Sequence, residues 1–477
     1  MRNDNNQKVK MVVKEGGKGT MSTQLNFTEN KKIVNQMRYT ESALKEKEHL
    51  IELNKKPFSQ KLAGYLKLSG PGFLEAAFTL GAGSFTSSVT LGAAYGYTML
   101  WIPFYSFAFG LFMLALATRF VTVSEIPVIQ AQNKYHGKFI GSFSTGFVAC
   151  FIASLVFSFG QYALGADSVT SAVGLVGLNI PKEISWIFIF VTSAPLALLY
   201  GRGNGTKYVK MIEDVMKILI LIMLIVFGAV LFVTGINIPE MIKGIFIPKI
   251  PSGIEGITML IASLTATIGV MDWVLFNNAM YSRGFSEEHE TLGRFDSVMG
   301  GLIPVTLVLS LVSIAFAEAF AGKPSIPTSS SELASALISI IPSVWIQAGF
   351  YIGIMALIIS TMIGLSIVAA TTFCQSFNLE PDPAKWYWAV LILSPHIGFL
   401  GAFFGKPVMV VITVAAMQSI FNWLSGMSWY LLGNDIRYLG KKVVQSRIFN
   451  IGILLSITIL NMVFLTFILS KLGVWPA

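Results

Sequence analysis

The chain has 477 residues, of which 54% are hydrophobic and only 12% are charged, with a net charge of +9 at neutral pH. A soluble protein of this length carries about twice that charged fraction, so the composition excludes an ordinary soluble enzyme. No basic stripe with interleaved aromatic residues is present, which argues against nucleic acid as a partner.

The first 57 residues are polar and rich in lysine, and they contain no apolar core of the kind found in a cleavable signal peptide. We interpret 1–57 as a cytoplasmic tail and 58–477 as a membrane domain. Residues 33–53 place apolar residues among charges, which is compatible with an amphipathic helix on the membrane surface and equally with a disordered tail.

Repeated apolar runs of about 20 residues predict an all-α membrane protein. Eleven spans are expected, at residues 72–92, 97–121, 143–175, 184–200, 214–235, 256–282, 298–320, 345–375, 387–404, 408–432 and 448–471. With the N-terminus inside, the inside segments carry 28 of the 34 Lys and Arg residues. The odd number of spans then places the C-terminus outside. The predicted location is the plasma (inner) membrane, with the lipid bilayer as partner.

Two spans are interrupted by glycine. Gly81-Ala82-Gly83 lies near the middle of the first span, and Gly269 lies near the middle of the sixth, before Val270, Met271 and Asp272. The two positions are equivalent if spans 1–5 and 6–10 form two repeats of opposite orientation, and such a pair points to a binding site at the membrane midplane. The alternative is that these glycines only allow helices to pack closely.

The first interrupted span and its continuation resemble a known family. Ser69-Gly70-Pro71-Gly72 begins the span, and Tyr95-Gly96-Tyr97 followed by Leu100-Trp101 opens the second; a stretch in span 6 runs from Ala266-Thr267 to Ser282-Arg283. This frame resembles the Nramp divalent-metal transporters over about residues 58–472. The resemblance implies a LeuT-like inverted repeat of about eleven helices, with helices 1 and 6 broken and alternating access.

The metal ligands of that family are replaced here. Where the family reads Asp-Pro-Gly-Asn in span 1, this sequence has Gly81, Ala82, Gly83 and Ser84. Where the family reads Met-Pro-His in span 6, an ungapped alignment gives Gly269, Val270 and Met271. A shift of two residues would instead keep Met271 as a ligand and place Trp273 at the histidine. The carboxylates that the family ties to proton movement in span 3 fall on Phe159 and Tyr162.

These replacements favour an anion as substrate. The amide ends of the half-helices would remain as the dominant local charge, glycine would allow close approach, and hydroxyls would add donors. We therefore expect a secondary transporter of a small inorganic anion, with bicarbonate as the choice. The expected substrate-binding residues are Gly81, Ala82, Gly83, Ser84, Phe85, Thr86, Gly269, Val270, Met271 and Asp272, with Ser87 and Ser88 as further hydroxyls near the start of the second half-helix.

Two alternatives stay open. A divalent cation, Mn²⁺ or Mg²⁺, could be held by Asp272, Met271 and backbone carbonyls of span 1. Alternatively, the domain could be a membrane sensor whose tail binds a partner. No Walker loop and no nucleophile–base pair is present, so neither an ATP-driven pump nor an enzyme is expected, and a monomer is favoured.

Sodium is a candidate coupling ion. Ser360 and Thr361 in span 8 correspond to a small-hydroxyl pair in the family, and with Asp272 they are the candidate coupling-ion residues. Hydroxyls can also simply pack between membrane helices. No other cofactor is implied by the sequence.

The remaining polar residues within spans are weaker candidates. Glu75 could line a path from the inner surface or pair with a cation, and Asp167 is similar but weaker. His396, Asn277 and Asn278 are compatible with packing or with a polar cavity, and Cys150 and Cys374 are interpreted as packing residues.

Overall fold

The structure is a computed structural model that describes residues 41–200, 202, 207–251, 253–267, 269–321, 325–340, 343–444 and 446–474. Within these ranges every regular element is a helix. The first 40 residues, and with them most of the predicted tail, lie outside the described residues.

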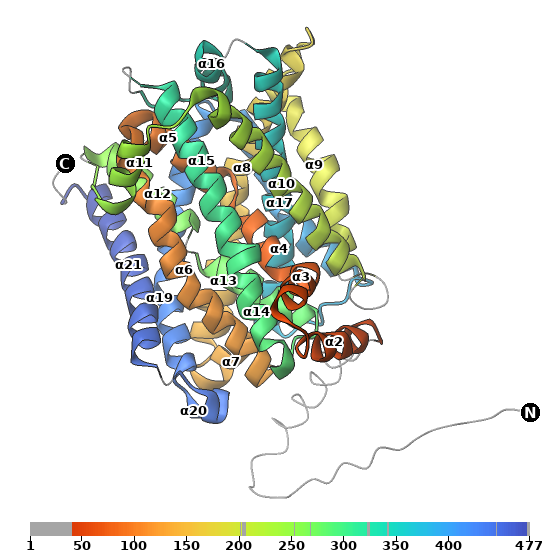
Figure 1. The fold of residues 1–477 in the computed structure, drawn as a ribbon. Coiled ribbons are helices and arrows are strands. Elements are labelled where there is room, and N and C mark those ends of the chain that lie inside the picture. The colour runs from red at the N-terminus through yellow and green to blue at the C-terminus, as the bar shows by residue number, and fades with distance from the viewer. Residues whose placement is uncertain are drawn as a thin grey trace, which may run out of the picture.

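All eleven predicted spans coincide with helices in the described part of the chain (Figure 1). Eight of them lie in helical runs that are long and apolar enough to cross a membrane: 101–124, 139–174, 182–199, 207–233, 253–282, 287–319, 344–377 and 386–403. The other three are the broken pair α4 (Pro71–Thr79) and α5 (Ala82–Tyr95), together with α19 (Pro407–Gly433) and α21 (Arg447–Lys471). Apolar sequence of this length satisfies its backbone within each helix, as a bilayer requires.

The remaining elements have the following bounds. They are α2 (Glu41–Leu53), α3 (Phe58–Leu68), η1 (Gly96–Met99), α6 (Trp101–Arg119), η2 (Phe120–Ser124), α7 (Val128–Tyr135), η3 (Phe139–Ile152), α8 (Ala153–Gly174), α9 (Lys182–Leu199), α10 (Lys207–Thr234), α11 (Ile238–Phe246), α12 (Gly253–Thr267), α13 (Val270–Ser282), η4 (Glu287–His289), α14 (Glu290–Asp296), η5 (Ser297–Leu302), α15 (Ile303–Ala319), α16 (Ser330–Ile340), α17 (Val344–Phe377), α18 (Trp386–Leu393), η6 (Ser394–Phe403), α20 (Ile436–Leu439) and η7 (Gly440–Lys442).

Both predicted interruptions are present. Gly81 is extended (φ −84°, ψ −179°) and precedes α5, and Gly269 is extended (φ −112°, ψ 151°) and precedes α13. The half-helix α4 contacts α10, α13 and α17 inside the bundle. The two breaks therefore lie among other helices, where the freed backbone groups find protein partners instead of lipid.

The last four carbonyls of α4 illustrate this, because a helix end leaves them without partners of its own. The Ala76 carbonyl accepts the Leu80 amide, and the Thr79 carbonyl accepts the Ser84 hydroxyl. The hydroxyls of Ser360 and Thr361 in α17 donate to the carbonyls of Ala77 (2.8 Å) and Phe78 (3.1 Å). Span 8 thus holds the end of half-helix α4 in place.

Part of the predicted tail packs against the membrane domain. Helix α2 buries Ala43, Glu46, Leu50 and Leu53. In Figure 1 it lies at the end of the bundle opposite to the C-terminal end of α21. Glu46 pairs with Arg283, at the end of α13, and with Lys210 in α10. Arg283 also pairs with Glu213 in α10 (3.0 Å). This cluster connects α2 to spans 5 and 6.

We predict that Glu46→Gln destabilises the folded protein by about 1–3 kcal/mol, because it removes a charged hydrogen-bond acceptor from the buried Arg283 guanidinium. Burial raises the pKa of Glu46, but Arg283 and Lys210 more than offset this and hold its pKa below the ordinary value. The contribution of Glu46 is therefore complete above the ordinary carboxyl pKa and is lost as the pH falls below it.

Thermal unfolding in detergent between pH 3.5 and 7 measures this difference, and limited proteolysis reports whether α2 detaches. Glu48→Gln, an exposed position on the same helix, is the matched control. Equal melting temperatures for the two variants at pH 7 would contradict the prediction.

Candidate functional site at the two helix breaks

The glycines of the first break lie in very little free space. A Cβ atom on Gly81 would come within 2.8 Å of Thr361 Oγ1 and 3.2 Å of Gln161 Nε2, and one on Gly83 would lie 2.8 Å from the Phe157 ring. Residues 81–86 are all buried. Close packing against spans 3 and 8 therefore requires glycine here.

Several of the expected anion donors already have acceptors. The Ala82 amide donates to Gln161 Oε1 (3.0 Å), and the Ser84 and Ser87 hydroxyls donate to backbone carbonyls of Thr79 and Gly83. By contrast, the hydroxyls of Thr86 and Ser88 are buried and have no hydrogen-bond partner. Two of the four expected hydroxyl donors are thus committed elsewhere.

Phe85 has a packing role. Its ring lies 5.5 Å from that of Phe227 in α10 and 6.3 Å from that of Phe350 in α17, measured between centroids. The side chain joins an aromatic group between spans 5 and 8.

The second break brings Asp272 to the end of α4. Asp272 is the third residue of α13, and its Oδ1 accepts a hydrogen bond from the Thr79 hydroxyl (2.6 Å). Val270 and Met271 are fully buried beside it, and Trp273 packs against Trp429. Because α13 begins at Val270, the break lies at Gly269. In the ungapped alignment this residue stands where the family has the Met of Met-Pro-His. The structure thereby places an acidic side chain in hydrogen-bond contact with the last residue of α4.

A second carboxylate stands next to this pair. Glu75 lies one turn before Thr79 on α4, and its Oε1 accepts from the same Thr79 hydroxyl (3.2 Å). Its other oxygen, Oε2, is buried without any hydrogen-bond partner. The sequence-based alternative of a pairing with Lys or Arg is not found among the ion pairs of the described residues.

The candidate coupling-ion residues lie around the end of α4. Ser360 and Thr361 face the end of α4 and contact the carbonyls of Ala77 and Phe78. Asp272 is joined to the same half-helix through Thr79. The three residues therefore surround one helix end, although in this structure the two hydroxyls are engaged as donors.

The span 3 positions carry no carboxylate relay. The Phe159 ring packs near Phe404 (6.5 Å), and the Tyr162 hydroxyl lies 2.6 Å from His396 Nδ1. His396 is buried, and its Nε2 has no partner. Tyr162 and His396 thus connect spans 3 and 9.

Three further polar candidates hold helices together. Asp167 accepts from the amide and hydroxyl of Ser330 at the start of α16 (2.7 and 2.6 Å). Asn277 bonds to the backbone of Val128 and Ala117, and Asn278 bonds to Gln375. Cys150 and Cys374 are buried free thiols. These contacts are structural.

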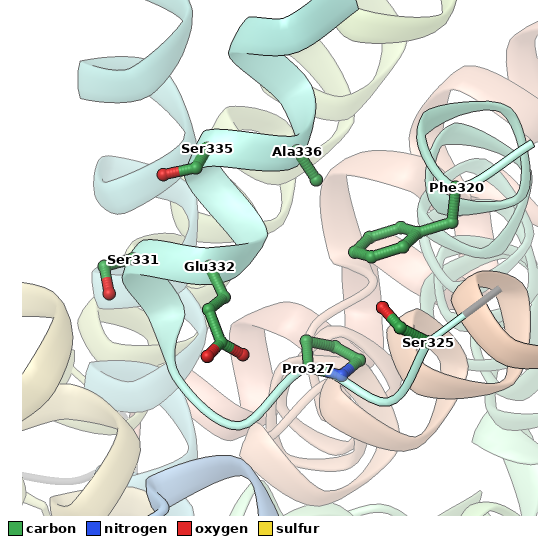
Figure 2. A pocket seen from close by; sticks show the side chains of 7 residues that line it. All are labelled: Phe320, Ser325, Pro327, Ser331, Glu332, Ser335 and Ala336. Carbon is green, nitrogen blue, oxygen red and sulfur yellow. The ribbon is translucent and has the colours of Figure 1, made fainter. Parts of the chain in front are cut away.

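A separate hollow lies between the end of α15 and α16, far from the breaks in the sequence and at the other end of the bundle from α2 (Figures 1 and 2). Figure 2 shows Glu332 facing Pro327 and Ser325 across it. The Glu332 carboxylate is held by the amide and hydroxyl of Thr328 (2.6 and 3.0 Å). None of the residues that line this hollow is a candidate site residue.

Sequence reasoning missed Thr79 and Gln161. Thr79 bridges the two carboxylates, and Gln161 receives the first amide of α5. The available signals were a hydroxyl four residues after Glu75 and an amide side chain in the middle of an apolar span. Among the described residues, no group of three or more His, Cys, Asp or Glu side chains is placed to hold a metal.

The chain matches one family model over most of its length. The description of that model is natural resistance-associated macrophage protein-like (Nramp), and it covers residues 72–470. The metal transporter nramp1 homolog of Dictyostelium discoideum is 25% identical over 266 residues, 54% of this chain and 47% of the relative. The divalent metal cation transporter MntH of Lacticaseibacillus casei is 28% identical over 188 residues, 39% of this chain and 38% of the relative.

A solved structure shares the fold. The manganese transporter of Eremococcus coleocola, in complex with an aromatic bis-isothiourea substituted compound, has a TM-score of 0.68 at 17% identity, covering 88% of this chain and 90% of that chain. The helical fold expected from the sequence is thereby confirmed. The alignments to the curated relatives span half of their length or less.

We predict that Gly81→Ala destabilises the protein by about 1–3 kcal/mol, because the added methyl group overpacks the contact with Thr361. Gly174→Ala, at the exposed end of α8 where a Cβ meets nothing within 4 Å, is the control and is expected to be neutral or slightly stabilising. Thermal unfolding in detergent measures both. Equal effects of the two substitutions would show that the first break is not tightly packed.

Proposed function

The chain belongs to the Nramp family, and on that premise we propose that it is a secondary transporter whose substrate is a divalent metal cation, Mn²⁺ or Mg²⁺. As a family member with many apolar helices it is an integral membrane protein and not an enzyme. The observation that carries the proposal is the buried carboxylate of Asp272 at the meeting point of the two broken helices.

Charge at the breaks favours a cation. Asp272 and Glu75 supply two carboxylates, while no Lys, Arg or His side chain among the described residues forms an ion pair with either. The end of α4 contributes the negative end of a helix dipole, and each of its carbonyls keeps a second lone pair beside its hydrogen bond. An intramembrane carboxylate is costly and marks an ion path by default. Met271 could add a soft ligand from the same turn.

The same geometry disfavours the bicarbonate expected from the sequence. The Ala82 amide and the hydroxyls of Ser84 and Ser87 donate within the protein, and an anion would meet two carboxylates nearby. The proteins that this chain resembles are named as transporters of metal or divalent metal cations. The expectation of an anion rested on the absence of the family's own metal ligands. It did not include the pairing of Glu75 with Asp272 through Thr79, which only the structure shows.

For orientation, we propose that the end of the bundle carrying α2 faces the cytoplasm. The excess of Lys and Arg in the segments at this end supports it. The sensor alternative differs from the proposal in one respect, because a sensor binds its ion without moving it across the bilayer.

We predict that Asp272→Asn weakens Mn²⁺ binding by a factor of at least about 10–100, as expected for loss of an important group at a metal site. Titration calorimetry with Mn²⁺ and Mg²⁺ in detergent measures affinity, and uptake into proteoliposomes measures transport. Asp214→Asn, at an exposed carboxylate in α10, is the control. Bicarbonate uptake by the wild type without any metal uptake would refute the cation proposal, and metal binding without flux would favour the sensor.

We also propose Ser360 and Thr361 as the position of a coupling Na⁺, since two hydroxyls and the carbonyls of Ala77 and Phe78 form an oxygen-rich group at a helix end. The double variant Ser360→Ala, Thr361→Val is predicted to abolish any dependence of uptake on sodium. Ser366→Ala, which removes another buried hydroxyl of α17, is the control. Metal uptake that is independent of sodium in the wild type would exclude this role.

A further inference from the structure

Glu75 is the least satisfied charged group near the breaks. Its side chain is 3% exposed, and Oε2 faces no donor although it is buried. Gly301 at the start of span 7 allows close approach, because a Cβ there would lie 2.9 Å from this oxygen. A carboxylate oxygen buried without a donor in a membrane protein is costly. The position is therefore occupied either by a proton or by a cation, because no cationic side chain among the described residues pairs with it.

The number of hydrogen-bond donors around Glu75 supports the same conclusion. The Thr79 hydroxyl carries one hydrogen, yet it lies within hydrogen-bond distance of both Asp272 (2.6 Å) and Glu75 (3.2 Å). One hydrogen cannot serve both carboxylates at the same time. The three side chains therefore form a cluster that has more oxygen acceptors than hydrogen donors.

The space beside this cluster is about 10 Å³, which is room for about one water molecule. Glu75 and Thr79 line a small cavity between α4, α6 and the start of span 7, together with Ser106 and Thr306 and otherwise apolar residues. No Lys, Arg or His side chain lines it in the described part of the chain. The nearby carboxylate of Asp296 accepts the amides of Gly70 and Gly72 at Oδ2 (3.3 and 2.8 Å), its Oδ1 has no hydrogen-bond partner, and the residue does not line the cavity.

We propose that Glu75 is the second carboxylate of a cation site completed by Thr79 and Asp272, one helical turn from the break. All three side chains offer oxygen atoms as ligands, which suits a hard divalent cation, Mg²⁺ or Mn²⁺. Softer ions such as Cd²⁺ prefer sulfur or nitrogen ligands. This inference rests on the proposed cation transport and deepens it, because it assigns a ligand set without Met271.

The test is calorimetric titration of the purified full chain with Mg²⁺, Mn²⁺ and Cd²⁺. Glu75→Gln, which preserves shape, is expected to weaken Mg²⁺ and Mn²⁺ binding at least tenfold and to lower the preference for Mg²⁺ over Cd²⁺. Thr79→Val should act in the same direction, and Thr79→Ser should restore binding. Glu332→Gln, at the carboxylate of the separate hollow, is the control. Melting temperatures identify variants that fail to fold. If a variant fails, the order of Mg²⁺, Mn²⁺ and Cd²⁺ affinities in the wild type still distinguishes a site with oxygen ligands only from a site that includes sulfur.

The outcomes separate the two proposals. Unchanged affinities in Glu75→Gln, with binding lost in Asp272→Asn, would overturn the role of Glu75 and leave cation transport in place. Cd²⁺ binding far more tightly than Mg²⁺ in the wild type would also overturn it and assign the site to Met271. A wild type that binds none of the three metals would overturn the proposed function itself.

Discussion

Satisfaction of the backbone at the end of α4 is the constraint on which the site depends. In a bilayer a helix can stop at the midplane only if its last carbonyls find donors inside the protein. Here the donors are the Leu80 amide, the Ser84 hydroxyl beyond the break and two hydroxyls of span 8. Without them the interruption at Gly81 would leave polar groups in a medium that offers none.

The same arrangement determines which side chains meet. Because α4 ends at Thr79 and α13 begins at Val270, Thr79 and Asp272 are the polar residues nearest to each other across the two breaks. Glu75 lies one turn before Thr79 on α4 and contacts the same hydroxyl. The acidic character of the centre thus follows from where two helices stop, and it is the basis on which we propose a cation as the substrate.

At the α2 end, the buried Arg283 ties span 6 to span 5 and to the N-terminal helix. The start of α4 is enclosed in the same region, since a Cβ on Gly70 would collide with Glu213 and Arg283. Any motion of α4 that opens the site toward this end must therefore rearrange the ion pairs.

The sequence alone determined the number and order of the spans, both interruptions and the family resemblance. Length of apolar runs and glycine at matching positions are local properties, so they can be recognised without knowing what packs against what. It also singled out Asp272, Ser360 and Thr361 as candidate site residues, but it did not pair Asp272 with Thr79 and Glu75. Only the tertiary structure decided that Thr79 joins Asp272 to Glu75, that Gln161 takes the first amide of α5, and that part of the polar N-terminal segment packs on the bundle. Thr79 and Asp272 are separated by 193 positions, and a contact between residues so far apart depends on how two broken helices pack, which no local pattern records.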